Sequence, residues 1–379
     1  MNAIRRFRIE TPEEDLVDLR RRINATRWPD RETVDDWSQG APLAYVRQLA
    51  AYWADGYDWR GRERALNRFD QFLTEIAGVD IHFIHQRSPH PDALALLVTH
   101  GWPGSIVEFH KIIGPLTDPV AHGGDVRDAF HVICPSLPGY GFSGKPTGTG
   151  WGVERIAEAW QVLMRRLGYD RYGAQGGDWG AAVTTRLGRV AGDGCIGIHL
   201  NMPIARPTPA ARDNPTAQDE AALAALGHYL DRDSGYAKQQ RTRPQTLGYG
   251  LVDSPVGQLA WIIEKFWSWT DCDGHPENAL GRDEMLDNVM MYWLTGSAAS
   301  SARLYWESFG RMGRDRVEVP TGVAAFPKEI LRAPRSWCEP VYNIVHWTEM
   351  PRGGHFAAFE QPELLVEDVR AFFAPLREG

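Results

Sequence analysis

Short apolar runs alternate with amphipathic stretches through the first half of the chain. Residues 94–98 and 130–134 are continuous apolar segments, which is typical of strands buried inside a parallel sheet. Helical periodicity follows each of them, at 105–116 and 153–167. Strands that alternate with helices in this way predict a doubly wound α/β sheet.

The alternation stops between residues 204 and 312, where several helical patterns follow one another. We expect helices at 218–230, 255–266, 282–294 and 297–309, and a loop in the Pro-, Ala- and Thr-rich stretch 207–218. Strand character returns at 322–326, so the helices form an insertion between two halves of one sheet. The predicted organisation is an N-terminal segment (1–90), the first half of the core (91–203), a helical cap (204–312) and the second half of the core (313–379).

The N-terminal segment starts with a helix and continues with a high density of aromatic rings. Pro12 begins the helix with acidic residues after it, Leu16, Leu19 and Ile23 mark its apolar face, and Trp28-Pro29 ends it. The rings are Trp37, Tyr45, Tyr52, Trp53, Tyr57, Trp59 and Phe69. They favour a segment that wraps around a larger body over a carbohydrate-binding patch. A hairpin of strands 69–76 and 79–85, joined at Ala77-Gly78, completes the segment.

Composition narrows the class of protein. A net charge of −8 with scattered arginines gives no basic stripe, so we expect no nucleic-acid partner. The N-terminus lacks the apolar core of a signal peptide and no run reaches a membrane span, which predicts a soluble, cytoplasmic protein. The four cysteines have no C-x-x-C spacing and are expected to be buried free thiols. We expect neither a metal nor a cofactor.

The strongest candidate for chemistry is the run from Tyr172 to Ala182, Y-G-A-Q-G-G-D-W-G-A-A. It has the small-x-nucleophile-x-small pattern of a strand-to-helix elbow, with Asp178 at the position of the nucleophile. A Cβ atom at Gly176 or Gly180 would collide with neighbouring backbone in such a turn. By itself the run fits equally well a glycine-rich turn with a helix-capping aspartate.

A histidine further along the chain favours the catalytic interpretation. His355 follows two glycines after the apolar strand 344–347, and the order nucleophile, acid, histidine is that of α/β-hydrolases. A carboxylate nucleophile attacks saturated carbon and forms an alkyl ester, which a His-activated water then hydrolyses. That chemistry restricts the substrate to epoxides or alkyl halides.

A second motif, H-G-W-P-G at 100–104, follows the first buried strand. In α/β-hydrolases a turn at this point supplies an oxyanion-hole amide, which here is the N–H of Trp102. The amide of Trp179, directly after Asp178, is the expected partner. A plain Gly-Pro turn is the structural alternative.

Together these motifs resemble the microsomal-type epoxide hydrolase family, nearly from end to end. The resemblance is carried by T-R-W-P (26–29), Y-D-W-R (57–60), I-H-F-I-H (81–85), T-H-G-W-P-G-S (99–105), G-G-D-W-G (176–180), D-S-P-V-G (253–257) and R-G-G-H-F-A-A-F-E (352–360). It implies an N-terminal meander packed on an α/β-hydrolase core with a helical cap. Membrane-anchored members carry an N-terminal apolar helix that is absent here, which favours the soluble branch.

The resemblance also implies the remaining site residues. It puts the acid of the triad at Glu329, with Glu349 as the alternative nearer to His355. It puts two cap tyrosines, Tyr236 and Tyr305, on the epoxide oxygen as hydrogen-bond and proton donors. Tyr229, Tyr249 and Tyr292 also lie in the cap, without a match to the motif.

Two other functions remain open from the sequence. A haloalkane dehalogenase shares the Asp, His and acid plan, with Trp102 and Trp179 as halide-holding donors. A ligand-binding receptor with the hydrolase fold is the non-enzymatic alternative. The cap rings Trp261, Phe266, Trp267, Trp269, Tyr292 and Trp293 favour a bulky hydrophobic or aromatic epoxide as substrate. The oligomeric state is left open, with a homodimer as one option.

Overall fold

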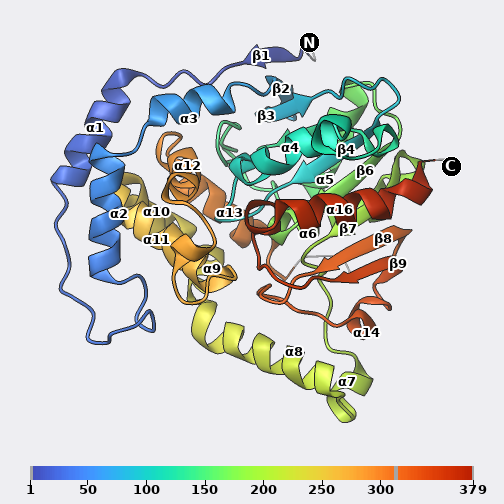
Figure 1. Cartoon of the computed structure of the whole chain (residues 1–379). Coiled ribbons are helices and arrows are strands. Elements are labelled where there is room, and N and C mark those ends of the chain that lie inside the picture. The colour runs from blue at the N-terminus through green and yellow to red at the C-terminus, as the bar shows by residue number, and fades with distance from the viewer. Residues whose placement is uncertain (1–2, 311–314, 378–379) are drawn as a thin grey trace.

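The computed structural model describes residues 3–310 and 315–377, and within these ranges the chain forms one nine-stranded sheet with helices on both faces (Figure 1). The strand order is β1-β2-β3-β5-β4-β6-β7-β8-β9. The strands are β1 (Arg5–Phe7), β2 (Gln71–Ile76), β3 (Val79–Gln86), β4 (Leu94–Thr99), β5 (Phe130–Pro135), β6 (Tyr172–Gly176), β7 (Cys195–Leu200), β8 (Val317–Ala325) and β9 (Tyr342–Glu349). The predicted doubly wound sheet is therefore confirmed.

The direction of the strands divides the sheet into two parts. β1, β2, β3 and β5 pair antiparallel, whereas β5, β4, β6, β7, β8 and β9 pair parallel. The predicted hairpin is confirmed, with Ile76 opposite Val79. Its turn residues Ala77 and Gly78 have φ of 51° and 82°, as a tight hairpin turn requires. β8 begins at Val317, before the predicted 322, because Pro320 interrupts the strand pattern of its first half.

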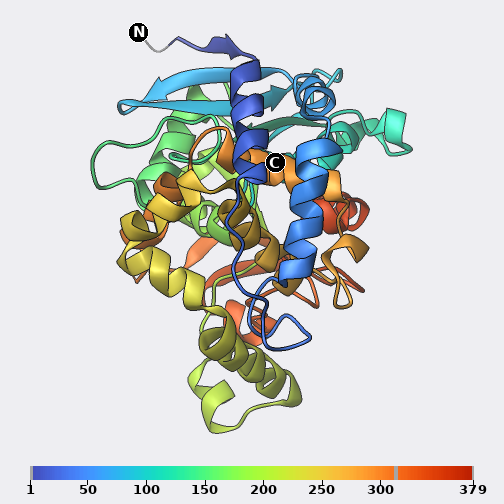
Figure 2. The ribbon, with the colours of Figure 1, turned by 90° about the vertical axis from the view of Figure 1, so that its left-hand side faces the viewer.

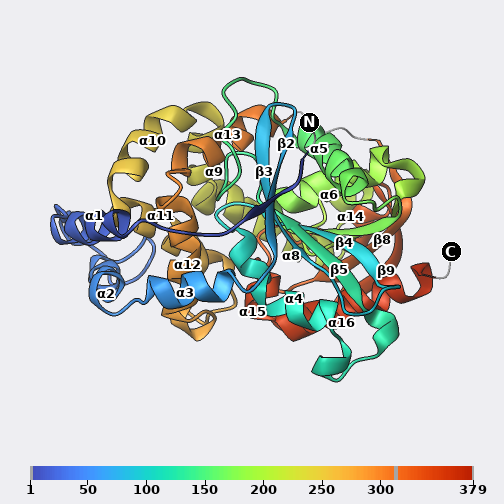
Figure 3. The ribbon, with the colours of Figure 1, turned by 90° about the horizontal axis from the view of Figure 1, so that it is seen from above.

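Four helices cover the sheet. α5 (Val153–Arg166) and α6 (Asp178–Val190) pack together on one face, and α4 (His110–Thr117) and α16 (Pro362–Phe373) pack together on the other (Figure 3). The helix predicted at 105–116 is instead a 3₁₀ turn, η1 (Ile106–Phe109), followed by α4. Ser105 and Glu108 form a capping box that starts the turn, which explains the break.

The cap helices lie between β7 and β8. They are α7 (Pro209–Asp213), α8 (Ala217–His228), the π-helical turn η5 (Tyr229–Asp233), α9 (Gly235–Thr242), α10 (Pro244–Asp253), α11 (Pro255–Trp269), η6 (Pro276–Asn278), α12 (Arg282–Trp293) and α13 (Ala298–Ser308). The four predicted helices correspond to α8, α11, α12 and α13. The predicted boundary between cap and core, at 312/313, lies outside the described residues.

One cap prediction was wrong. The stretch 207–218, expected to be a loop, contains α7 and the start of α8. Thr208 and Thr216 cap these helices with their side chains, and Pro209 is the first residue of α7. The two helices protrude from the rest of the molecule (Figures 1 and 2).

The N-terminal segment contains three helices that lie against the cap, α1 (Glu13–Asn24), α2 (Leu43–Asp55) and α3 (Trp59–Leu66) (Figure 2). Pro12 precedes the first helix rather than starting it. The ring-rich sequence that suggested only a wrapping segment folds as α2 and α3. Tyr57 donates to the buried Asp287 of α12 at 2.7 Å, and Arg62 pairs with the same carboxylate. The wrapping segment therefore holds the cap as well as the core.

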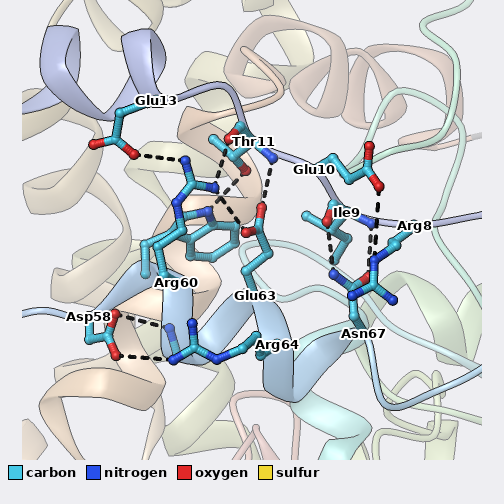
Figure 4. Close-up of polar contacts among 12 residues, drawn as sticks. Arg8, Ile9, Glu10, Thr11, Glu13, Asp58, Arg60, Glu63, Arg64 and Asn67 are labelled. Carbon is cyan, nitrogen blue, oxygen red and sulfur yellow. Dashed lines mark hydrogen bonds and ion pairs between the residues drawn. The ribbon is translucent and has the colours of Figure 1, made fainter.

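The start of the chain is fastened to α3 by a polar network (Figure 4). Asn67 accepts from the N–H of Ile9 at 2.9 Å and donates to its carbonyl at 2.8 Å. Glu63 accepts from the N–H of Thr11 at 2.7 Å, and Arg60 donates to the Thr11 carbonyl at 2.7 Å. These bonds satisfy extended backbone that has no sheet partner between β1 and α1.

Short elements complete the chain: η2 (Val120–His122), η3 (Val126–Asp128), η4 (Gly192–Gly194), α14 (Arg335–Cys338), α15 (Ala357–Glu360) and η7 (Ala374–Leu376). All four cysteines are buried and free, as predicted. Among the described helices, none combines the length and apolar character needed to cross a bilayer.

Candidate active site

Asp178 stands at the sharp turn between β6 and α6. Its φ is +50°, a left-handed conformation that is strained for a residue with a Cβ. The turn is tight enough to require glycine on both sides. A Cβ on Gly176 would lie 2.3 Å from the carbonyl oxygen of Gly180, and one on Gly180 would lie 1.8 Å from that of Thr99. The collisions expected from the sequence are therefore found.

The Asp178 carboxylate is held by one backbone amide of the H-G-W-P-G turn. The Trp102 N–H donates to Asp178 Oδ1 at 2.8 Å. This close approach requires Gly101, because a Cβ there would lie 2.1 Å from the same oxygen. Within the described residues no hydrogen bond joins the Trp179 N–H to the Asp178 carboxylate, so only one of the two predicted amides contacts it.

His355 lies between two carboxylates. Its Nε2 is 3.4 Å from Asp178 Oδ2, and its Nδ1 is 2.6 Å from Glu329 Oε1. The backbone fixes the ring, because the His355 N–H donates to the Trp269 carbonyl at 2.8 Å. Burial opposes protonation of His355, but the Glu329 and Asp178 carboxylates outweigh it and raise its pKa well above the usual value.

Glu329, rather than Glu349, is the carboxylate that meets His355. Glu329 follows β8 and is buried, and the Ile330 N–H donates to the same Oε1 at 2.6 Å. Glu349 is exposed at the end of β9, where it accepts from Trp347 Nε1 at 3.3 Å.

The two predicted cap tyrosines pack on the tryptophans that flank the carboxylate. The Tyr236 ring stacks on Trp102 with centroids 4.9 Å apart and planes at 9°, and the Tyr305 ring meets Trp179 edge-on at 4.8 Å. Burial raises the pKa of both hydroxyls well above 10, and the charge of Asp178 adds to the effect. Both tyrosines therefore stay protonated as hydrogen-bond donors.

The hydroxyls of these tyrosines differ in their partners. The Tyr236 hydroxyl lies 2.9 Å from that of Tyr229. The Tyr305 hydroxyl is buried without a hydrogen-bond partner in the described part of the protein. A buried unsatisfied donor is costly, and at a site of this kind it indicates a position that a ligand fills.

The other cap tyrosines have different surroundings. Tyr292 donates to the carbonyl of Gly104, two residues after Trp102, at 2.7 Å and so supports the H-G-W-P-G turn. Tyr249 is 73% exposed. We therefore assign neither Tyr292 nor Tyr249 a role at the reacting atoms.

Most of the cap rings that suggested a bulky substrate pack elsewhere. Phe266 packs on Phe356, and Trp267 stacks on Trp37 of the N-terminal segment. Trp261 and Trp269 reach the site, where Trp102 is within 6.4 Å of each ring centroid.

Two hollows adjoin the site. A cavity of about 20 Å³ is lined by Asp178, His355, Glu108, Gln175 and Asn201, among others, and has room for one water molecule. A surface pocket of about 580 Å³ reaches Tyr305 from outside. Its other walls are Arg206, Arg241, Thr242, Trp306, Phe309 and Gly310.

Two glutamates near His355 were missed in the sequence, Glu108, which is buried, and Glu360, which is half-buried. Glu108 belongs to the capping box, and burial raises its pKa to about 8. Glu360 accepts from the N–H groups of Asp271, Gly354 and Phe356, and burial raises its pKa to about 7. It fixes the loop that carries His355. The S-x-x-E spacing could have revealed Glu108. Glu360 ends the R-G-G-H-F-A-A-F-E motif (352–360), but its contacts with three backbone N–H groups could not be read from that motif.

Within residues 3–310 and 315–377 no group of three or more His, Cys, Asp or Glu side chains could hold a metal ion.

Comparison with known proteins agrees with this geometry. A family model described as "Epoxide hydrolase N terminus" matches residues 4–109, and one described as "alpha/beta hydrolase fold" matches residues 95–245. A protein of Stigmatella aurantiaca (strain DW4/3-1), named provisionally as an epoxide hydrolase, is 54% identical over 98% of this chain and 85% of its own length. Epoxide hydrolase 1 of Sus scrofa is 38% identical over 99% of this chain and 90% of its own length. The solved structure of an Aspergillus niger epoxide hydrolase has a TM-score of 0.90 and 33% identity, covering 99% of this chain and 97% of that one. The predicted α/β-hydrolase fold is thereby confirmed.

Proposed function

The chain belongs to the epoxide hydrolase family, and we propose that it converts an epoxide to a vicinal diol through a covalent ester on Asp178. One observation carries the proposal. The Asp178 carboxylate lies 2.8 Å from the Trp102 amide and 3.4 Å from His355, next to two buried tyrosines. This set of groups suits attack on saturated carbon with acid assistance at the leaving oxygen.

In the first step Asp178 attacks a carbon of the epoxide ring. Trp102 holds Oδ1, so Oδ2 is the oxygen available for attack. A C–O bond forms to the carboxylate, and the ring C–O bond breaks with its electron pair on the epoxide oxygen. Tyr305 and Tyr236 donate hydrogen bonds to that oxygen, and one of them gives its proton. The raised pKa of both hydroxyls keeps the donors protonated until this moment.

In the second step water hydrolyses the ester. His355 Nε2 takes a proton from the water while Glu329 holds Nδ1 and stabilises the imidazolium. The amides of Trp102 and Trp179 donate to the oxyanion of the tetrahedral intermediate. The cavity of about 20 Å³ beside His355 has the size of a site for this water. The intermediate then collapses, and the bond between the carboxyl carbon and the diol oxygen breaks. The proton that His355 took passes to this leaving oxygen, and the second proton of the water restores the hydroxyl of the tyrosine. Asp178 returns as a carboxylate, so the sum is epoxide plus water to diol.

The charge of Asp178 affects the pKa of His355 differently before and after the ester forms. In the free enzyme burial opposes protonation of His355, but Glu329 and Asp178 together raise its pKa well above the usual value. Ester formation neutralises Asp178 and removes one of the two causes of the raised pKa. With its pKa lowered, more of the imidazole is unprotonated and able to accept a proton from water at the stage when the ester is present.

We propose a bulky hydrophobic or aromatic epoxide as the substrate. The pocket of about 580 Å³ that reaches Tyr305 offers a route from the surface, with Trp306 and Phe309 in its walls. On the inner side of Tyr305, Trp261 and Trp269 pack edge-on against Trp102 and add to the aromatic surroundings of Asp178. The dehalogenase and receptor alternatives are less favoured, because the relatives that match over nearly the whole chain carry the name epoxide hydrolase.

A substrate panel tests the proposal. Purified protein is incubated with aliphatic, styrene-type and polycyclic arene epoxides, and with a chloroalkane series, while diol and halide are measured. We expect diol from at least one bulky epoxide, abolished in Asp178→Ala, and no Asp178-dependent halide release. Absence of diol from the whole panel, or halide release that exceeds diol formation, would overturn it.

A further inference from the structure

The π-helical turn η5 contacts Tyr236 with its first residue and helix α11 with its last. Tyr229, its first residue, places a hydroxyl 2.9 Å from the Tyr236 hydroxyl. Asp233, its last residue, points to α11, where it accepts from Trp269 Nε1 at 2.6 Å and from Lys265 Nζ at 3.1 Å. π-Helical turns are rare and are frequent at functional sites.

Lys265 is a buried cation that this turn holds in place. Only 3% of its side chain is exposed, and its Nζ lies 3.1 Å from Asp233 and 2.6 Å from Glu264. A buried ammonium needs such partners because it has lost its hydration. The carboxylates of Asp233 and Glu264 therefore stabilise this charge among the aromatic rings.

The ammonium lies over the ring of Tyr236. Nζ is 4.6 Å from the Tyr236 ring centroid and 5.3 Å from that of Trp269. The Trp102 indole stacks on the Tyr236 ring with planes at 9°, so it covers one face and leaves the other to the cation. Within residues 3–310 and 315–377 no cation lies over the Tyr305 ring, which contacts the rings of Trp102, Trp179, Tyr236 and Phe309.

We propose that Lys265 is a positioning residue for the reaction, whose charge stabilises the negative charge on the Tyr236 oxygen when this hydroxyl gives its proton to the opened epoxide. The proposal rests on the proposed function. The O–H bond of Tyr236 breaks, the epoxide oxygen gains the proton, and the electron pair stays on the phenolate. A cation over the ring face lowers the energy of this phenolate, and the effect is strengthened because both the Lys265 ammonium and the Tyr236 ring are buried. Either hydroxyl can donate in the 2.9 Å contact between Tyr229 and Tyr236, but once Tyr236 has lost its proton only Tyr229 can donate to the phenolate oxygen.

The inference also separates the two tyrosines. Tyr236, with a cation over its ring and a hydroxyl partner, is the proton donor. Tyr305, with neither, contributes a hydrogen bond to the epoxide oxygen and keeps its proton.

A double-mutant cycle tests the role of Lys265. The rate constant of Asp178 alkylation is measured by rapid quench and intact-protein mass spectrometry in wild type, Lys265→Met, Tyr236→Phe and the double variant. We expect Lys265→Met to slow alkylation by about 10- to 100-fold in the presence of Tyr236. In the Tyr236→Phe background the same change should have less than about a 3-fold effect, because the phenolate no longer forms. Lys265→Arg should restore most of the rate.

Matched variants separate this role from a structural one. Lys111 also lies over a ring, with Nζ 5.4 Å from the Phe359 ring centroid and 2.5 Å from Glu284. Neither of these partners is Tyr236 or Tyr305. Lys111→Met should leave the alkylation rate unchanged. If Lys265→Met does not fold, Asp233→Asn replaces it in the cycle, since it frees the ammonium without removing it.

Equal slowing by Lys265→Met with and without Tyr236, or alkylation at the wild-type rate, would contradict the role of Lys265. Failure of the proposed function itself looks different, because wild-type protein would then show no alkylation of Asp178 at all.

Discussion

Nδ1 of His355 lies 2.6 Å from Oε1 of Glu329, and both side chains are buried. The Ile330 N–H donates to the same oxygen at 2.6 Å, so the carboxylate cannot rotate away from the imidazole. The contact fixes the tautomer that presents Nε2 to Asp178. It joins the loop after β8, which carries Glu329, to the loop after β9, which carries His355, and β8 and β9 are neighbouring strands.

Replacing Glu329 tests this contact. Glu329→Gln keeps the shape but removes the charge that stabilises the imidazolium, so ester hydrolysis should slow by roughly 10²- to 10⁴-fold. Alkylation should change much less. Stopped-flow measurement of both phases checks this, with Glu349→Gln as the control on the exposed end of β9. Wild-type hydrolysis in Glu329→Gln would remove Glu329 from the triad.

The role of His355 is tested by trapping the ester. His355→Gln cannot accept the proton from water, whereas Asp178 remains able to attack. Intact-protein mass spectrometry under saturating epoxide should show a stable adduct equal to the mass of the substrate, on the peptide that contains Asp178. The double variant Asp178→Ala/His355→Gln should show none. If His355→Gln binds substrate and forms no adduct, the histidine acts before the ester exists.

The tyrosine hydroxyls should matter in the first step. Tyr305→Phe and Tyr236→Phe should each slow alkylation by roughly 10²-fold or more, and the double variant should be nearly inactive, because an alkoxide without a donor is a poor leaving group. Tyr249→Phe, at a residue 73% exposed, serves as the control. Circular dichroism should show an intact fold in all variants. Full activity of Tyr305→Phe would exclude it from the site.

The narrow turn around Asp178 predicts an effect on folding. A Cβ on Gly180 would lie 1.8 Å from the Thr99 carbonyl oxygen, and backbone cannot move away cheaply. Gly180→Ala should therefore destabilise the fold by about 3 kcal/mol or more, or prevent folding. Gly227→Ala, in α8 with nothing within 4 Å, should be neutral or slightly stabilising. Urea unfolding followed by tryptophan fluorescence compares them, and equal stabilities would contradict the described packing.

Much of this fold could be predicted because its core strands are short apolar runs between helices. α2 was missed because its aromatic residues hid the helical period, and α3 and α9 because they are polar and short. Their helical state depends on packing against distant parts of the chain, as in the contact of Tyr57 with Asp287. Local pattern carries no information on such contacts.

The residues of the site also differ in whether they could be predicted from the sequence. Glycine-containing motifs carry Asp178, His355 and Trp102, and the glycines are required by close approaches of the backbone. These residues could therefore be recognised from the sequence. Lys265 and Asp233 meet only in space, 32 positions apart, and neither lies in a motif. The electrostatic surroundings of Tyr236 were therefore beyond the reach of the sequence, although the tyrosine itself was not.

The most direct test of the account follows the oxygen atoms through one turnover. Excess enzyme is incubated with the epoxide in oxygen-18 water, and the diol and the tryptic peptide containing Asp178 are weighed by mass spectrometry. In the ester route the diol takes its second oxygen from the Asp178 carboxylate, and solvent oxygen enters the carboxylate. The account therefore predicts largely unlabelled diol and labelled Asp178 in the first turnover, with label in the diol only in later turnovers. Labelled diol in the first turnover, with Asp178 unlabelled, would show direct attack by water and contradict the covalent mechanism.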